Sequence, residues 1–525
     1  MMTASSHRPI VMTGHRGMVV AGHHLAAEAG AQMLREGGNA MDAAIAAAAT
    51  LAIAVPFMNG LGGDAISLWC DASGRVETIN GTGRLAGAFD AQALADQGHA
   101  VLPQKGPLTV TVPGVVAAWG EALARHGTRA LADVLAPAID AAETGVPMDA
   151  TNTAFFNGPV YAAMCRDYPD LADMFGPPGG CRLGQILRQP GAAATLRGLA
   201  NDGWRAFYAG PLAEAWLTRA RAQGVLLSAD DLAAHRTDFC APLAVAWRGM
   251  TLHAAPPNSQ GLALAALAGL DGHIPAKVAD DADDPLIDPL AYLAQKQAAF
   301  AARDRWCADP SRVTLPADLL DPAGLQRLAA ETPGRPPVSG GGDTSTLVVV
   351  DRDGNAVSWV QSLFEEFGSG VACPAQGIVL QNRARLETLD GDPVRGARGG
   401  MRPFHTLCPA ILTQDGSVAM TLATPGDHGQ PQSLYQILRR HFEQGLDIQQ
   451  AVEWPRIRHD TGDTVLLEDR CPDAWDALLE QAGWRVRRVG AWSRLMGGAN
   501  AIARQPDGLL MGGADPRRSC YALIG

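Results

Sequence analysis

Lysine is nearly absent from this 525-residue sequence, and there is no excess of positive charge. Lys105, Lys277 and Lys296 are its three lysines, beside 39 arginines, a bias that we attribute first to codon usage. Acidic residues outnumber basic ones by 54 to 42, for a formal net charge of −12. Because nucleic-acid-binding proteins display a basic face, this composition argues against a nucleic-acid partner.

Long apolar runs are missing as well. The longest covers residues 43–55 and is interrupted by Thr50, whereas a membrane-spanning helix needs about 20 apolar residues. Residues 1–17 are polar and contain no apolar segment of the kind found in secretory signals. We therefore expect no membrane partner, no secretion and a cytoplasmic location.

Motifs for metals and organic cofactors are also absent. The nine cysteines are scattered without a Cys-x-x-Cys pair, which argues against a disulfide framework or a zinc site and fits a reducing compartment. His23 and His24 are adjacent, so on a helix they do not form a two-ligand face. The sequence contains no GxSxG, HExxH or Walker motif. We predict an activity that needs neither metal nor cofactor.

The hydrophobic fraction of 47% is large enough for an extensive core. The pattern predicts helices over residues 24–36, 39–55 and 433–443 and a mainly helical region over 150–335, followed by a Pro/Gly/Ser-rich linker at 331–342. It predicts strands at residues 17–22, 65–70, 76–80, 346–350, 356–363, 377–380, 410–413 and 418–423. Helices thus flank a strand-rich part that contains an antiparallel hairpin, and a layered α+β sandwich fits this order better than a doubly wound parallel sheet.

Two glycine-rich segments have chemical as well as structural interpretations. Residues 60–64 (Gly-Leu-Gly-Gly-Asp) form a turn that could bind an anion through its N–H groups, although a need for positive φ explains the glycines more simply. In residues 340–344 (Gly-Gly-Gly-Asp-Thr), the linker meets the first residue of a buried strand. This is either an ordinary loop-to-strand junction or a self-cleavage site. Cleavage before Thr344 would create a hydroxyl nucleophile whose own α-amine, with a pKa of about 8, serves as the base.

The second interpretation gains support from the surrounding sequence, which resembles the γ-glutamyltranspeptidase family of N-terminal-nucleophile hydrolases. The matching stretches run almost end to end, with residues 150–330 less clearly matched. They lie at residues 37–44, 60–64, 111–114, 343–344, 350–357, 367–370, 402–406 and 424–426.

The resemblance implies a four-layer αββα sandwich, made as one precursor and cut between Asp343 and Thr344. The products would be a large subunit, residues 1–343, and a small subunit, residues 344–525, which together form one interleaved domain. Thr344 would be both the cleavage residue and the catalytic nucleophile. Ser362 falls where the family has a hydroxyl residue that supports the nucleophile, its alternative being a strand hydroxyl facing solvent.

By the same resemblance, Gly426 and Asp427 fall on a Gly-Gly pair whose N–H groups receive the oxyanion. Asp427 departs from the second glycine, and its carboxylate would repel an anionic substrate if it pointed inward. His428 could be its partner, and a surface Asp at a turn is the equally weighted alternative.

The sequence departs most from the family where the glutamyl substrate is held. Gly83 falls on the arginine that binds the α-carboxylate, with Arg84 one place later, and Arg385 falls on the aspartate that binds the α-amine. His405 and Thr406 replace two serines, and Phe364 replaces an asparagine near the nucleophile. We interpret Arg383, Arg385 and Arg84 as an anion site, because arginine forks match carboxylates, with solvated or structural ion pairs as the alternative for each.

The resemblance therefore implies a self-processing threonine amidohydrolase that acts on a small carboxylated amide such as oxamate, releases ammonia and takes part in purine catabolism. Within the family, the alternatives are a γ-glutamyl hydrolase or transferase that acts on glutathione-like substrates and a cephalosporin-type acylase. Outside catalysis, the chain could be an uncleaved pseudoenzyme. The expected partners are the substrate and the two subunits of the same precursor, and a homo-oligomer stays open.

Overall fold

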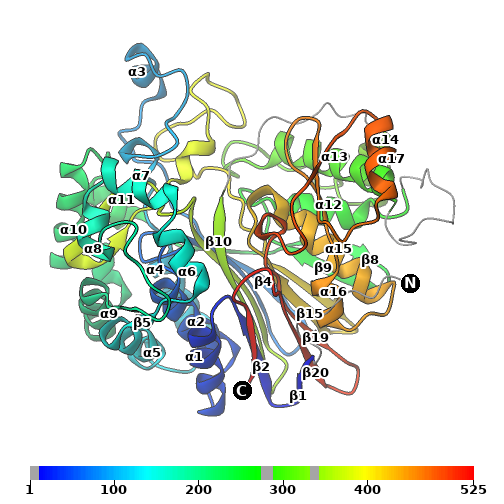
Figure 1. The fold of residues 1–525 in the computed structure, drawn as a ribbon, viewed down its shortest axis with the longest axis horizontal. Coiled ribbons are helices and arrows are strands. Elements are labelled where there is room, and N and C mark those ends of the chain that lie inside the picture. Colours follow the sequence, from blue (N-terminus) through cyan, green and yellow to red (C-terminus); the bar gives the residue numbers. More distant parts are fainter. Residues whose placement is uncertain (1–10, 274–287, 331–341) are drawn as a thin grey trace.

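A computed structural model of the protein describes residues 11–273, 288–330 and 342–525. Of the linker expected at residues 331–342, only Gly342 is among them. Two antiparallel sheets lie in the middle of the molecule, with one group of helices on the left and another on the right in Figure 1. This is a mixed α+β fold, as the sequence predicts.

The first sheet contains the hairpin that begins at the Gly-rich junction. Its central strands are β10 (Asp343–Asp351) and β11 (Ala356–Phe364), which pair antiparallel across a turn. Strands from the N-terminal part of the chain flank this hairpin on both sides, with β10 next to β2 and β11 next to β3. The remaining strands complete the order β21-β2-β10-β11-β3-β4-β7, with bounds β21 Tyr521–Ile524, β2 Gly17–Ala21, β3 Asp64–Cys70, β4 Val76–Gly81 and β7 Asp238–Cys240.

The second sheet also has seven strands, all paired antiparallel. In spatial order they are β1 Met12–Gly14, β20 Leu510–Ala514, β19 Asn500–Arg504, β15 Ser417–Ala423, β14 Ala410–Gln414, β9 Met250–Ala254 and β8 Leu243–Trp247. Smaller sheets join β16 Ile457–His459, β17 Thr464–Leu467 and β18 Arg485–Arg488, then β12 Ala372–Cys373 with β13 Ile378–Val379, and β5 Val146–Pro147 with β6 Ile186–Leu187.

Helices cover the outer face of each sheet (Figure 1). On the side of the first sheet lie α1 His24–Arg35, α2 Ala40–Ala54, α4 Val115–His126, α5 Leu131–Thr144, α6 Ala150–Phe156, α7 Pro159–Asp167, α8 Asp170–Phe175, α9 Pro190–Asp202, α10 Pro211–Ala222 and α11 Ala229–Ala234. On the other side lie α12 Gly261–Gly269, α13 Pro289–Trp306, α14 Pro322–Ala330, α15 Gln430–Phe442, α16 Ile448–Glu453 and α17 Ala474–Gln481. The short α3 (Ala91–Asp96) projects at the top of Figure 1.

Strand β10 shows how alternation builds this arrangement. Leu347 and Val349 belong to the apolar core shared with the helices on the left, whereas Val348 and Val350 belong to a core between the two sheets. Successive strand residues point to opposite faces, so a continuous run of apolar residues is needed where both faces are buried. Such a strand holds the residues at its start in a fixed place.

Helix α2 illustrates local specification on the outer side of the first sheet. The side chain of Asn39 accepts from the backbone N–H groups of Met41 and Asp42, and the Asp42 carboxylate accepts from the N–H of Asn39. This capping box fixes the start of a helix in which every residue is buried. The expected helix at residues 39–55 is therefore confirmed.

The region expected to be mainly helical also contributes strands that the sequence analysis missed. Strands β8 and β9 lie at the edge of the second sheet, and β7 lies at the edge of the first. Edge strands such as β8 alternate buried and exposed residues over only five positions, which leaves a weak signal.

Candidate active site

Thr344 lies at the start of β10, where the strand departs from regular pairing. Asp343 pairs with Phe364 and Ser345 pairs with Gln361, so the register shifts across Thr344 and forms a bulge. The Thr344 side chain is buried and lines a small cavity of about 20 Å³, enough for about one water molecule. Bulges re-aim side chains beside active sites, and here the bulge turns the expected nucleophile toward β11.

Ser362 on β11 connects the two sides of the junction. Its hydroxyl donates to the carbonyl oxygen of Asp343 at 2.7 Å and accepts from Thr344 Oγ1 at 3.3 Å. It also accepts from the N–H of Phe364 at 2.7 Å. Ser362 is buried, which excludes the solvent-facing alternative. One hydroxyl therefore contacts both the oxygen of the expected scissile bond and the atom that would attack it.

Two arginines hold the side-chain carboxylate of Asp343. Arg494 Nη2 lies 2.9 Å from Asp343 Oδ2, and Arg518 Nη1 pairs with Asp343 Oδ1. The N–H of Thr344 also donates to Asp343 Oδ1, at 2.8 Å. These contacts describe the junction with residues 343 and 344 joined by a peptide bond.

Gly426 and Asp427 lie in the turn that leads from β15 into α15. Gly426 has a φ of +124° and Asp427 a φ of +54°, and Pro425 lines the same cavity as Thr344. Asp427 is buried, so the surface alternative is wrong. Burial raises the pKa of Asp427 to about 6, partly offset by the charges of Arg458 and Arg383.

His428 does not serve as a charged partner of Asp427. The two side chains are 3.9 Å apart, and His428 Nδ1 instead contacts Arg303 at 2.9 Å. Burial, and then the charge of Arg303, hold the pKa of His428 well below its usual value, so the ring is neutral. The backbone N–H of Gly342 acts on the Asp427 carboxylate instead and lowers its pKa.

Arg383 is fully buried beside these groups. Its guanidinium lies 4.2 Å from the centre of the Phe364 ring, and its Nη1 donates to Thr406 Oγ1 at 3.0 Å. Nε and Nη2 have no partner in the described part of the chain. Burial lowers the pKa of Arg383 to about 10, opposed by the charges of Asp64, Asp427 and Glu365. Arg383 therefore remains a cation with two unused donors.

Asp64 and His405 complete this buried polar group. Asp64 Oδ1 accepts from the N–H groups of Gly83 and Gly114, both at 3.1 Å, and Asp64 Oδ2 lies 3.3 Å from His405 Nε2. Burial raises the pKa of Asp64 to about 7, opposed chiefly by Arg383. Burial also holds the pKa of His405 well below its usual value, so a neutral ring that donates from Nε2 fits this contact.

The other two arginines of the expected anion site are already in ion pairs. Arg385 Nε lies 2.9 Å from Glu365 Oε1, and Lys105 Nζ lies 3.2 Å from Glu365 Oε2. Arg84 is half-exposed and lies 3.3 Å from Asp309 Oδ2. The structural alternative therefore describes Arg84 and Arg385, and Arg383 is the one of the three that has no carboxylate in ion-pair contact among the described residues.

The glycines of residues 60–64 have a different explanation from the expected positive φ, because none of them adopts one. A Cβ atom at Gly62 would lie 2.1 Å from the carbonyl oxygen of Val379, and one at Gly63 would lie 2.7 Å from that of Ser362. These glycines therefore permit close backbone approach, which brings Asp64 level with Ser362 in the β3–β11 ladder.

The sequence analysis missed the two arginines that hold Asp343, and Asp64 as an individual side chain. Arg494 and Arg518 lie 151 and 175 positions from Asp343, and no local pattern marks either of them. For Asp64 a signal existed in the turn at residues 60–64, but it was assigned to the glycines.

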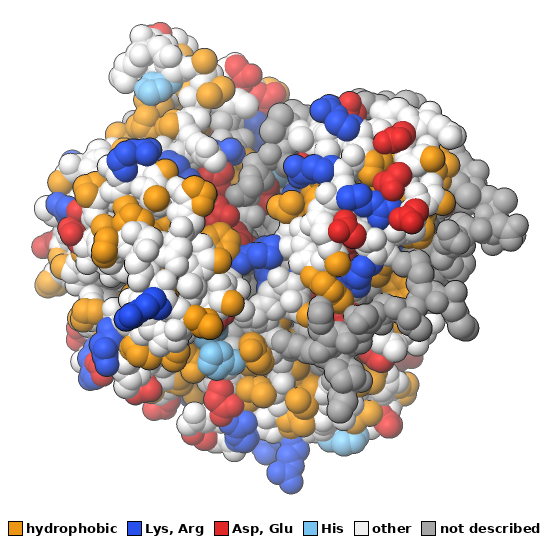
Figure 2. All heavy atoms as spheres, viewed as in Figure 1, with side chains coloured by type: hydrophobic (Ala, Val, Ile, Leu, Met, Phe, Trp, Pro, Cys, Tyr) orange, Lys and Arg blue, Asp and Glu red, His pale blue; other side chains and the backbone are white. Residues whose placement is uncertain are grey.

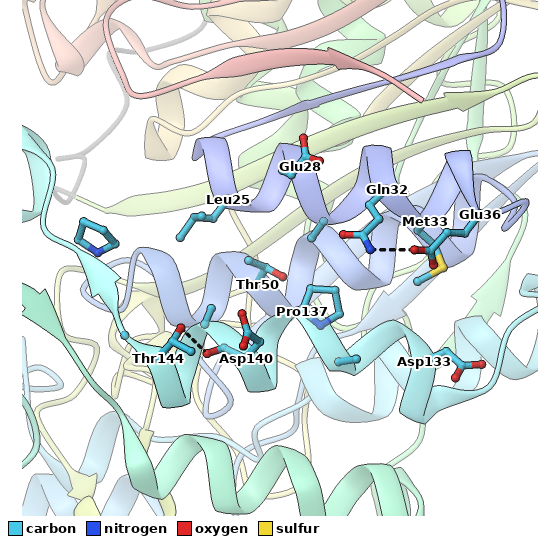
Figure 3. A pocket seen from close by; sticks show the side chains of 15 residues that line it. Leu25, Glu28, Gln32, Met33, Glu36, Thr50, Asp133, Pro137, Asp140 and Thr144 are labelled. Atoms are coloured by element: carbon cyan, nitrogen blue, oxygen red, sulfur yellow. Dashed lines mark hydrogen bonds between the residues drawn. The ribbon is translucent and has the colours of Figure 1, made fainter.

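The surface in Figure 2 is hollowed between its two lobes, with charged side chains along the hollow. A separate groove of about 450 Å³ lies between α1 and α5, rimmed by carboxylates such as Glu28 and Asp140 (Figure 3), and contains none of the expected site residues. Within the described ranges, no group of three His, Cys, Asp or Glu residues could hold a metal ion. In the same ranges, no helix is long and apolar enough to cross a membrane.

Comparison with known proteins agrees with this geometry. The family model described as gamma-glutamyltranspeptidase matches residues 26–524. The chain belongs to the γ-glutamyltranspeptidase family. It is 37% identical to the oxamate amidohydrolase proenzyme of Klebsiella pneumoniae, over 91% of this chain and 93% of that protein. It is 34% identical to a glutathione hydrolase-like proenzyme of Bacillus subtilis, over 91% and 93% of the two chains.

Among solved structures, the cephalosporin acylase from Bacillus halodurans superposes with a TM-score of 0.91. It is 30% identical and covers 99% of this chain and 97% of that one. Together these γ-glutamyltranspeptidase relatives confirm the expected family and identify the chain as a hydrolase, while their names span three substrate classes.

Proposed function

We propose that the protein is a self-processing threonine amidohydrolase whose precursor is cut between Asp343 and Thr344. Thr344 Oγ attacks the carbonyl carbon of Asp343 while its proton passes by way of the Ser362 hydroxyl to the departing nitrogen. The C–N bond breaks, and the nitrogen becomes the α-amine of Thr344. Water then hydrolyses the ester, which leaves a carboxylate on Asp343 and a free Thr344 hydroxyl. The single observation that carries this proposal is the Ser362 hydroxyl, which contacts both reacting groups.

In the processed enzyme, the α-amine of Thr344 takes the proton of its own hydroxyl as that hydroxyl attacks the substrate amide. Ammonia leaves with that proton, and water releases the acid from the acyl-enzyme. The N–H groups at Gly426 and Asp427 would receive the oxyanion. The positive φ of both residues is consistent with a turn built to aim backbone N–H groups.

For the substrate we propose a small amide that carries a carboxylate, such as oxamate. Support comes from Arg383, whose two unused donors are buried, and from the named activity of the Klebsiella relative. Arg385, His405 and Thr406 would surround this site, and Arg84 would contribute only if it left Asp309. Arg385 stands where the family places an aspartate for an α-amine, which disfavours a glutamyl donor.

An acylase is the second candidate, favoured by the superposition on the cephalosporin acylase. The two candidates differ in the charge of the group that the site must bind, because a bulky neutral acyl group cannot form an ion pair with a buried guanidinium. Leaving donors of a buried cation without a partner is costly, so the unused Nε and Nη2 of Arg383 favour an anionic substrate.

We further propose that the helix–sheet–sheet–helix arrangement is the four-layer αββα sandwich, with subunits 1–343 and 344–525 forming one interleaved domain. The placing of β10 and β11 between β2 and β3 supports this, because strands from both sides of the junction share one sheet. A location in the cytoplasm and a role in purine catabolism belong to the same proposal.

The test compares the purified wild-type enzyme and its variants on three substrates. The assays measure ammonia release from oxamate, and turnover of a γ-glutamyl anilide and of a cephalosporin-type acyl amide. We expect the highest kcat/KM for oxamate. Arg383→Gln should lower that value by about one to two decades, because a charge-assisted hydrogen bond contributes about 1.5–3 kcal/mol. Arg440→Gln, at a buried arginine near the end of α15, is the matched control. Preference for the anilide or the acyl amide, with oxamate turnover unchanged in Arg383→Gln, would refute the substrate assignment.

A further inference from the structure

Arg494 and Arg518 form a pair of cations beside Thr344 to which the proposed chemistry assigns no role. Both guanidinium groups hold the Asp343 carboxylate, and both line the cavity that Thr344 also lines. Their side chains are 29% and 9% exposed. Among the described residues, Asp343 is the only carboxylate in ion-pair contact with either of them. Asp343 on the cleavage junction is therefore the acid in direct contact with both cations, while Glu366 acts on Arg494 from farther away.

The pair is firmly positioned apart from Asp343. Arg518 Nε donates to the carbonyl oxygen of Gly497, and Arg518 Nη2 donates to the carbonyl oxygen of Arg494, both at 3.3 Å. The Arg494 guanidinium lies 4.4 Å from the centre of the Phe155 ring. These contacts keep the two cations in place whether or not Asp343 is present.

Cleavage removes the covalent link that holds Asp343 against the pair. Asp343 becomes a chain end, while both arginines stay on the segment that begins with Thr344. Each arginine then faces a like charge without its counter-ion. Burial, and then the charge of Arg518, lower the pKa of Arg494 to about 10, whereas the charges of Asp343 and Glu366 raise it. Because both guanidinium groups are largely withdrawn from solvent, the loss of this counter-ion favours binding of another anion.

We propose that the Arg494–Arg518 pair becomes a carboxylate-binding site of the mature enzyme once Asp343 leaves. We also propose that the two carboxyl carbons of its ligand have the same spacing as those of Asp343. The Asp343 carboxylate is separated from the carbonyl carbon under attack by two carbon atoms. The matching ligand is therefore a four-carbon dicarboxylate or its monoamide, with the carboxylate on the arginines and the amide at Thr344. This inference rests on the proposed amidohydrolase function, in which Arg383 holds the carboxylate of oxamate, and it adds a second carboxylate position that extends the substrate class to succinamate.

Binding can be tested without catalysis, in precursors that cannot be cut. Thr344→Ala keeps Asp343 in the site, whereas Thr344→Ala combined with Asp343→Gly vacates it. Calorimetric titration with succinate should show binding to the double variant and none to the single one. Adding Arg518→Ala to the double variant should weaken binding at least tenfold, and Arg518→Lys, which keeps the charge without the fork, should weaken it less. Arg197→Gln, at an exposed ion pair with Glu143, is the matched control and should leave binding unchanged.

In the processed wild-type enzyme, succinate should bind and should inhibit amide turnover competitively. Absence of binding to the vacated precursor, or equal binding after Arg518→Ala in a variant that melts like the control, would overturn the proposal. Binding to the vacated precursor but not to the processed enzyme would also overturn it, because Asp343 would then still occupy the site. Failure of the amidohydrolase function itself would appear separately, as absent ammonia release with the calorimetric results unchanged.

Discussion

Ser362 offers the sharpest test of the proposed self-cleavage, because one hydroxyl contacts both the attacking atom and the carbonyl under attack. Ser362→Ala removes the hydrogen bond to the Asp343 carbonyl oxygen and the acceptor for Thr344 Oγ1. Loss of one donor at a developing oxyanion costs about 2.7–4 kcal/mol, or about two to three decades in rate. We expect cleavage of the precursor to slow by at least a hundredfold.

The same substitution also has a structural cost that must be separated from the chemical one. The buried N–H of Phe364 loses its acceptor, which costs about 1–3 kcal/mol of stability. Ser358→Ala is the matched control, because Ser358 is a buried serine on the same strand that bonds the Leu422 carbonyl oxygen and the N–H of Ala410. We expect a comparable loss of stability there, with cleavage at the wild-type rate.

The assay is a time course of intact mass after purification under conditions that preserve the precursor. The expected products have 343 and 182 residues, since cleavage falls after position 343 of 525. Ser362→Thr should retain part of the rate because it keeps a hydroxyl. Wild-type cleavage in Ser362→Ala, or equal slowing in Ser358→Ala, would refute the role given to this side chain.

Three further outcomes follow from the same geometry. Thr344→Ala should block both cleavage and turnover, while Thr344→Ser should keep some of each, which a denaturing gel and an ammonia assay would show. Gly498→Ala should slow cleavage about tenfold or more, because a Cβ there would lie 2.4 Å from Arg518 Cδ and displace the side chain that holds Asp343; normal cleavage would count against that contact. A chelator should leave activity unchanged, and loss of activity that a divalent ion restores would contradict the prediction of a metal-free mechanism.

Elements specified by local pattern could be predicted from the sequence, and contacts between distant segments could not. The capping of α2 by Asn39 and the β10–β11 hairpin depend on neighbours a few residues apart, so their signals are local. The junction at Thr344 was visible because a glycine-rich linker meets an apolar strand. The ion pairs of Asp343 could not be predicted, because Arg494 and Arg518 come from turns that are distant from it in the sequence.

Burial is the second property that the sequence could not supply. Three arginines were candidates for an anion site in the sequence, yet Arg84 and Arg385 pair with Asp309 and Glu365 while Arg383 keeps two free donors. Which arginine is available depends on where the carboxylates of other elements lie. A list of residue types therefore overcounts the groups that can contact a substrate.

The charges around Arg383 lead to a last prediction, on the pH dependence of substrate selection. Asp64 and Asp427 both act on this one cation, with pKa values raised by burial to about 7 and about 6. Below pH 6 both acids are largely protonated and the group is positive. As pH rises through 6 and 7 both acids ionise, and the positive charge around Arg383 falls, which weakens the attraction for an anionic substrate.

We therefore expect the ratio of kcat/KM for oxamate to kcat/KM for a neutral amide to fall by about a decade between pH 5.5 and pH 8, which corresponds to about 1.4 kcal/mol. Taking the ratio cancels the titration of the Thr344 α-amine, which both substrates need in its free-base form. Asp64→Asn should reduce the fall and confine it to the region near pH 6, because the amide oxygen can still accept from Gly83 and Gly114 while the charge is gone. A ratio that stays flat in the wild type would mean that the anion does not enter the field of these two acids, and it would place the substrate carboxylate away from Arg383.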